Sequence, residues 1–123
     1  MPKDTSKVQH FEAPSSAGKP DIVLVSSDNV KFNLHLKHLE IASELIADMT
    51  EGATRVAGEP IKLTDKASER AAVLDLVAEY FYNMRPAKLE EKPEELLVDM
   101  LAMSHKWGVH RAHEAAGNEL ARR

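Results

Sequence analysis

The sequence predicts an α+β fold in which a cluster of about five helices packs around a small, mostly three-stranded sheet. Two short segments with strand character lie close together, at residues 22–25 and 30–36, and a third follows at 60–63. Segments with the apolar spacing of helices lie between and after them. A chain of 123 residues has room for one such domain.

The composition narrows the class of protein. The formal charge of −4 disfavours a phosphate-binding surface, which needs clustered Lys and Arg. No apolar stretch approaches the roughly 18 residues expected of a membrane-spanning helix, and the chain has no Cys for disulfides or thiol chemistry. We therefore expect a nuclear or cytoplasmic protein that binds neither nucleic acid nor membranes.

Residues 1–20 are expected to form a flexible N-terminal tail, and residues 21–123 the folded domain. The run at 13–20 is rich in Ser, Pro and Gly, and has too few apolar side chains to offset the entropy of ordering. Val8 and Phe11 are the apolar anchors of the tail, and either could dock on the domain or on a partner.

An antiparallel hairpin is expected to begin the domain. Residues 22–25 form a β-branched run bounded by Pro20 and by polar turn residues at 26–29. Apolar side chains then alternate with polar ones, as in a strand with one buried face: Val30, Phe32, Leu34 and Leu36.

One helix is expected to begin near His38 and to end before Gly52, because its apolar residues repeat every three or four positions. Thr64 or Asp65 can cap the next helix, which is expected to run to about Tyr82 and to be the most buried. A loop at 50–59 and a short strand at 60–63 separate the two helices.

Two further helices are predicted near the end of the sequence. Pro93, followed by two Glu residues, suits a helix start. Gly108 is expected to end this helix in a left-handed conformation, with Val109 packing back onto it. The last helix is predicted from about His110 to Arg123.

The order of these elements and several short motifs resemble the BTB/POZ family, with fungal BTB proteins the most similar in pattern. The resemblance covers residues 21–123. It rests on an Asp before the first strand, a Phe-x-x-His second strand, a Ser in the helix that follows, a helix ending in Tyr, and the turn at 105–109. The motif residues are Asp21, Phe32, His35, Ser43 and Tyr82.

The resemblance implies a module for protein–protein interaction without catalytic activity, found in homodimers, in transcription regulation and in adaptors of cullin-type ubiquitin ligases. A homodimer is expected to use the tail and the apolar side chains around the first helix: Phe11, Leu36, Leu39, Ile46 and Met49. Leu36, Leu39 and Met49 have the core as their alternative. Trp107 and His110 are candidates for a partner-facing surface, and Trp107 too has the core as its alternative.

Three features depart from the family pattern. The tail stands where dimer-forming members usually have a long helix, which puts a strand-swapped dimer in doubt. Leu36 follows His35 at the place where a basic residue usually pairs with the Asp of the charged pocket. Residues 53–55 read Ala-Thr-Arg where cullin-binding members often carry an apolar-x-Glu pattern, so a cullin scaffold lacks support in the sequence.

Two alternatives to the dimer remain. The first is a monomeric adaptor resembling elongin C. The second is a small His-based metal-binding domain, although His105 is separated from His110 and His113 by the predicted break at Gly108. Because the chain has no Gly-x-Ser-x-Gly motif and no glycine-rich phosphate loop, we expect no enzyme activity, metal or cofactor.

Overall fold

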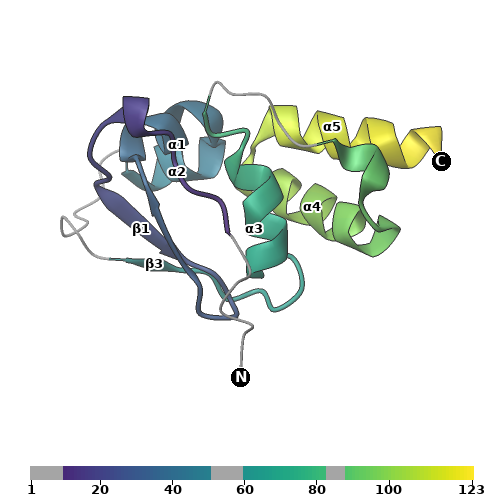
Figure 1. Ribbon diagram of the computed structural model, residues 1–123, viewed down its shortest axis with the longest axis horizontal. Coiled ribbons are helices and arrows are strands. Elements are labelled where there is room, and N and C mark those ends of the chain that lie inside the picture. Colours follow the sequence, from purple (N-terminus) through teal and green to yellow (C-terminus); the bar gives the residue numbers. More distant parts are fainter. Residues whose placement is uncertain (1–9, 51–59, 83–87) are drawn as a thin grey trace.

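The computed structural model describes residues 10–50, 60–82 and 88–123, apart from the side chains of residues 49 and 50. These residues form five α-helices and one three-stranded sheet, which confirms the predicted α+β class (Figure 1). None of the described helices is long and apolar enough to cross a membrane.

The sheet contains β1 (Ile22–Val25), β2 (Lys31–Leu34) and β3 (Ile61–Lys62), in the order β2-β1-β3. Strands β1 and β2 are antiparallel, which confirms the predicted hairpin, and β1 and β3 are parallel. Asn29 takes the positive φ of 68° that the hairpin turn requires, a conformation that Asn tolerates well. In the described part of the chain, the order β2-β1-β3 places strand β2 at one edge of the sheet.

The prediction of a single helix from His38 to before Gly52 is wrong. The segment forms two helices, α1 (Leu36–Ala42) and α2 (Glu44–Thr50), separated by an extended Ser43. The Ser43 hydroxyl accepts a hydrogen bond from the amide of Ile46 and donates one of 2.6 Å to the carbonyl of Trp107. Ser43 therefore caps the second helix and ties the break to another part of the domain.

The predicted second strand also ends earlier than expected, because Leu36 begins α1. The amide of Leu36 donates to the carboxylate of Asp21 at 2.8 Å, and the amide of Leu39 donates to the carbonyl of His35. These contacts turn the chain into a helix at the position where the alternating pattern alone would extend the strand.

Helix α3 (Ala71–Ala78) is shorter than the predicted helix from Thr64 or Asp65 to Tyr82. The carboxylate of Asp65 caps only a turn, by accepting the amides of Ala67 and Ser68. The helix itself begins where Asp28 accepts the amide of Ala71 at 2.9 Å. Six of its eight residues are buried, as expected for the central helix.

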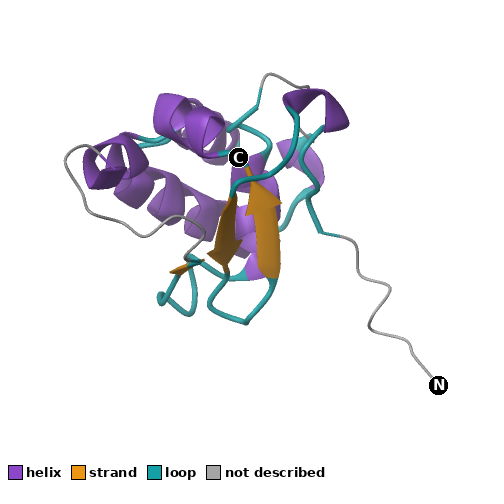
Figure 2. Cartoon of the chain, turned by 90° about the vertical axis from the view of Figure 1, so that its left-hand side faces the viewer, coloured by secondary structure: helices purple, strands orange, loops and turns teal. Residues whose placement is uncertain are grey.

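Helices α4 (Glu94–Trp107) and α5 (His110–Arg122) confirm the two predicted C-terminal helices. Gly108 between them has φ 68°, and the amide of Val109 donates to the carbonyl of Ser104, as in the predicted left-handed ending. Helix α3 lies between the sheet and the α4–α5 pair (Figure 1), and Figure 2 shows the strands gathered on one side of the helices.

Two short 3-10 helices complete the described elements, η2 (Ser15–Ala17) and η3 (Leu89–Glu91). The first belongs to the segment predicted as a tail, of which residues 10–20 are described. Phe11, predicted as an anchor of the tail, packs against the hydrophobic core of the domain. We call residues 10–15 the N-terminal segment.

Candidate interaction surface

The most exposed large apolar side chain of the described residues belongs to Ile41 on α1, which is 82% exposed. Leu39, two positions earlier, is fully buried. Because successive helix residues are turned by about 100°, two positions place a side chain on nearly the opposite side of the helix. The burial of Leu39 therefore directs Ile41 toward solvent.

Beside Ile41 lies a cavity of about 480 Å³. It forms where α1, the residues after α3 and the start of α5 meet. Contiguous exposed apolar surface marks interaction sites, and the residues that dominate such contacts, often Tyr and Arg, cluster in pockets. We call this region the Ile41 surface, and its lining residues are His38, Ile41, Ala42, Tyr80, Phe81, Tyr82, Val109, His110 and Arg111.

Polar groups border the Ile41 surface. The guanidinium carbon of Arg111 lies 5.7 Å from the centre of the Tyr80 ring, within the range of a cation–π contact. Nε2 of His110 lies 3.0 Å from the carboxylate of Glu44, and both side chains are well exposed. Such an exposed pair contributes little to stability. An apolar centre with a polar rim is the layout of many protein interfaces.

Tyr82 connects this surface to the interior. Burial raises the pKa of Tyr82 to about 12, so its hydroxyl stays protonated at neutral pH. The hydroxyl accepts the amide of His35 at 3.1 Å and lies 2.9 Å from Nδ1 of the same residue. Nε2 of His35 lies 2.8 Å from the carbonyl of Gly18. With a proton on Nε2, His35 donates to the carbonyl of Gly18 and accepts from the Tyr82 hydroxyl at Nδ1, so all these groups are satisfied.

Tyr82 also holds the N-terminal segment. The ring of Phe11 stacks on that of Tyr82, with 5.7 Å between their centres. The carboxylate of Asp75 on α3 accepts the amide of Phe11 at 2.8 Å and lies 3.0 Å from Nδ1 of His10. The segment is therefore attached to the domain by one carboxylate and one aromatic stack.

Two of the residues predicted at a dimer interface are core residues. Leu39 and Ile46 are both 0% exposed, so neither reaches a surface that a second copy can contact, and the interface prediction is wrong for them. For Leu39 the observed place is the core, which is its predicted alternative. Leu36 and Phe11 are half-buried and pack against the core. The side chain of Met49 lies outside the described residues.

Ile41 is not among the predicted interface residues, because it does not follow the apolar repeat of its helix. An apolar residue outside the repeat is not expected in the core, so this departure is the signal in the sequence that marks Ile41 as exposed. The sequence alone does not show which face of this seven-residue helix is exposed, because the elements that pack against the helix decide it.

Trp107 is 3% exposed and therefore a core residue, so of its two predicted places the core is the one observed and the partner-facing surface is not. Its indole N–H donates to the carboxylate of Glu69 at 2.7 Å. His110 is exposed, as expected of a partner-facing residue, and it belongs to the Ile41 surface.

The residues that carry the family resemblance have distinct places in the structure. His35 and Tyr82 are brought together by hydrogen bonds, and Ser43 separates the two short helices. Phe32 is buried in the core. Asp21 is exposed, and its carboxylate accepts a hydrogen bond from the amide of Leu36. These positions support the domain rather than form one common site.

Glu69 is a buried carboxylate that the sequence did not single out. It is 1% exposed, and it accepts the amides of Thr64 and Asp65 at 3.0 and 2.8 Å. Lys106 Nζ lies 3.1 Å from it. Burial alone raises the pKa of Glu69, but the hydrogen bonds from Asp65, Trp107 and Lys106 outweigh burial and lower the pKa.

The His residues do not meet in a larger group of metal ligands. Within the described ranges, no three His, Asp or Glu side chains are placed to hold a metal ion together. The rings of His105 and His113 lie 5.6 Å apart, and His35 is occupied by its contacts with Tyr82 and Gly18.

No protein-family model matches the chain, and no curated protein matches its sequence.

Proposed function

We propose that this chain is a protein–protein interaction module of the BTB/POZ type, and that it forms a homodimer through the Ile41 surface. The observation that carries the proposal is the exposure of Ile41, at 82%, beside a cavity with an apolar floor. Burying one such side chain contributes roughly 1.5–3 kcal/mol to an association.

The BTB/POZ assignment is supported by the order of the elements, which is a hairpin, two short helices, a strand, a central helix and a C-terminal helix pair. It is also supported by the contact between His35 and Tyr82, two residues of the family motif that lie 47 positions apart.

A second copy suits the Ile41 surface for reasons of charge. The rim carries both signs, with the Glu44–His110 pair next to Arg111. In a two-fold contact each copy presents the same patch, so a patch with both signs can place an acidic group against a basic one. A rim of a single sign would oppose itself in such a contact.

Sedimentation equilibrium on the full chain, from low to high micromolar concentration, tests the proposal. We expect a dimer for the wild-type chain and a monomer for Ile41→Asp. Val98→Asp is the matched control, because Val98 on α4 is also an exposed apolar residue, at 47%, and lies outside the Ile41 surface. Circular dichroism checks that both variants are folded.

A wild-type monomer at high micromolar concentration would contradict the homodimer. An Ile41→Asp variant that dimerises as the wild type does would contradict the assigned surface. If the chain is monomeric, the elongin C-like adaptor becomes the better proposal, and a pull-down with cullin scaffolds tests it.

A further inference from the structure

Among the described residues, strand β2 has two residues, Lys31 and Asn33, whose main-chain groups form no hydrogen bond at the edge of the sheet. The amide of Ser26 donates to the carbonyl of Val30 at 2.9 Å, so the even-numbered residues of β2 face β1. Along a strand, the main-chain N–H and C=O groups of successive residues point alternately to the two sides. The main-chain groups of Lys31 and Asn33 therefore point away from β1, toward the open edge. His35, the next odd-numbered residue, follows this rule, since its amide donates to Tyr82.

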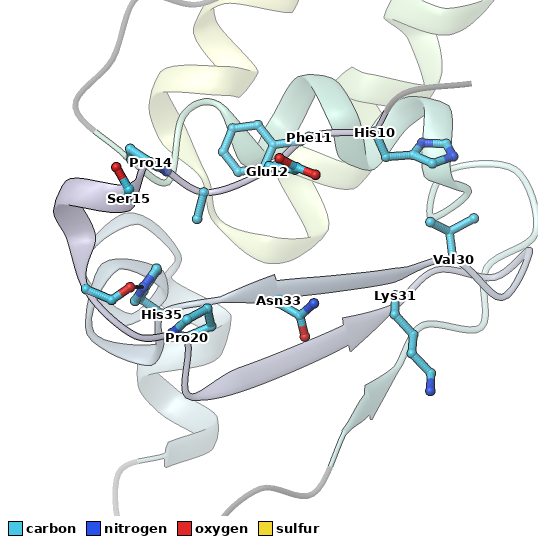
Figure 3. A pocket seen from close by; sticks show the side chains of 12 residues that line it. His10, Phe11, Glu12, Pro14, Ser15, Pro20, Val30, Lys31, Asn33 and His35 are labelled. Atoms are coloured by element: carbon cyan, nitrogen blue, oxygen red, sulfur yellow. Dashed lines mark hydrogen bonds between the residues drawn. The ribbon is translucent and has the colours of Figure 1, made fainter. Parts of the chain in front are cut away.

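The open edge lies along a groove of about 820 Å³ between β2 and the N-terminal segment. Val30, Lys31 and Asn33 line one wall, and His10, Phe11 and Glu12 line the other. Figure 3 shows the N-terminal segment running alongside β2, and the groove is bounded at one end by the ring of His10, whose centre lies 5.9 Å from that of Phe32 on the strand. We call this groove the β2 slot.

Both walls of the β2 slot are held in place. The N-terminal segment is fixed by Asp75 and by the stack of Phe11 on Tyr82. Strand β2 is paired with β1 on its other side. Within the described residues, the main-chain groups of Glu12 form no hydrogen bond either, so the second wall also offers groups to an occupant.

The side chains of the slot differ between its two faces. Lys31 and Asn33 are exposed on one face, and Lys31 has no ion-pair partner among the described residues. Val30 and Phe11 are half-buried toward the other face. An acidic side chain directly opposite Lys31 on an added strand would be stabilised by the cross-strand charge pair.

We propose that the β2 slot binds an extended peptide of another protein as a fourth strand, with an acidic residue opposite Lys31 and apolar residues at alternate positions. Adding a strand to an open edge is a general mode of peptide recognition, in which main-chain hydrogen bonds supply affinity and side chains supply specificity. The N-terminal segment closes the far side of the slot, which favours a single extended chain over the sheet edge of a second copy.

The heptapeptide Ser-Val-Thr-Val-Glu-Val-Ser is a suitable probe. Paired antiparallel to β2, it places Glu opposite Lys31 and Thr opposite Asn33. Added to the isotope-labelled full chain, it is expected to shift the amide resonances of Lys31 and Asn33 and to slow their hydrogen exchange. The same peptide N-methylated at Thr and Glu keeps its side chains but loses the donors toward β2, and is expected to produce neither change.

Charge reversal tests the specificity of the slot. Lys31→Glu is expected to weaken binding of the probe by about fivefold and to favour a probe with Lys in place of Glu, as cross-strand charge pairs predict. Lys62→Glu on β3 is the matched control, because Lys62 is also an exposed strand lysine and lies outside the slot. It is expected to leave binding of both probes unchanged.

Several results would overturn the proposal. Equal binding of the N-methylated probe would show that β2 adds no strand. Shifts confined to His38 and Ile41 would place the peptide on the Ile41 surface instead. Shifts of Lys31 and Asn33 that depend on protein concentration without any probe would make a second copy the occupant. The sedimentation of Ile41→Asp is independent of these results, so the two proposals can fail separately.

Discussion

The indole N–H of Trp107 donates a hydrogen bond of 2.7 Å to the carboxylate of Glu69, a group that is only 1% exposed. The carboxylate belongs to the turn between β3 and α3, and the indole to the last residue of α4. The contact therefore joins two distant parts of the chain through a buried charge. Its consequences for stability can be measured.

Glu69→Gln is expected to lower the free energy of unfolding by about 2 kcal/mol, a value within the usual range for a hydrogen bond to a charged group. The amide of Gln brings a donor to a place where Glu69 now accepts from Trp107, Lys106 and two main-chain amides. Urea denaturation followed by Trp fluorescence measures the change. Glu114→Gln, at an exposed position of α5, serves as control, and an equal loss in both variants would refute the special role of Glu69.

The same carboxylate gives the stability a defined pH dependence. Because the pKa of Glu69 is lowered in the folded state, its contribution is complete above the ordinary Glu pKa of about 4.3 and is lost as the pH falls through the lowered value. Asp28 acts in the same direction, since the hydrogen bonds from Ser26 and Ala71 outweigh burial and lower its pKa.

We therefore expect acid to destabilise the wild-type chain more steeply than Glu69→Gln. Urea midpoints measured between neutral pH and the acid transition give both slopes. If the two slopes are the same, Glu69 does not contribute to the acid sensitivity.

Tyr82→Phe removes the hydroxyl that serves both the amide and Nδ1 of His35. Two buried polar groups would lose their partner, at an expected cost of about 1–3 kcal/mol. Tyr80→Phe is the control, because the Tyr80 hydroxyl forms no hydrogen bond within the described residues, and a change of about 0.5 kcal/mol or less is expected there. Thermal and urea unfolding compare the two variants, and equal losses would argue against the contact with His35.

Two Gly→Ala variants are expected to have opposite effects. At Gly108, φ is 68° and a Cβ would lie 2.8 Å from the Cβ of Glu44. Gly108→Ala therefore destabilises by about 1–2 kcal/mol from backbone strain, with the collision in addition. Gly117 lies inside α5 with room for a methyl group, so Gly117→Ala is expected to stabilise by about 0.5–1 kcal/mol. The same sign for both changes in unfolding experiments would contradict this account.

The hairpin and the two C-terminal helices could be predicted from sequence because their signals are local. The alternation around Phe32, the Pro93 start and the Gly108 ending each depend on a few neighbouring residues. The break at Ser43 and the late start of α3 could not be predicted in this way. They depend on Trp107 and Asp28, which are distant in sequence from the residues they contact.

Prediction of the candidate surfaces from sequence is limited in the same way, because these surfaces also depend on contacts between distant residues. The family resemblance implies Leu39 and Ile46 as interface residues, but their apolar spacing marks the buried face of a helix, and both side chains are core. The exposure of Ile41 depends on the direction of α1, which the local sequence does not determine. The β2 slot depends on the path of the N-terminal segment, which is set by Asp75 and Tyr82 rather than by its own composition.

The most direct test of the interaction surface is an isotope-filtered NOE experiment on a mixture of labelled and unlabelled full chains, at a concentration where sedimentation gives a dimer. We predict intermolecular NOEs to the methyl groups of Ile41 and Ala42. A dimer whose intermolecular NOEs come only from residues outside the Ile41 surface, such as Val98, would contradict the assignment of this surface.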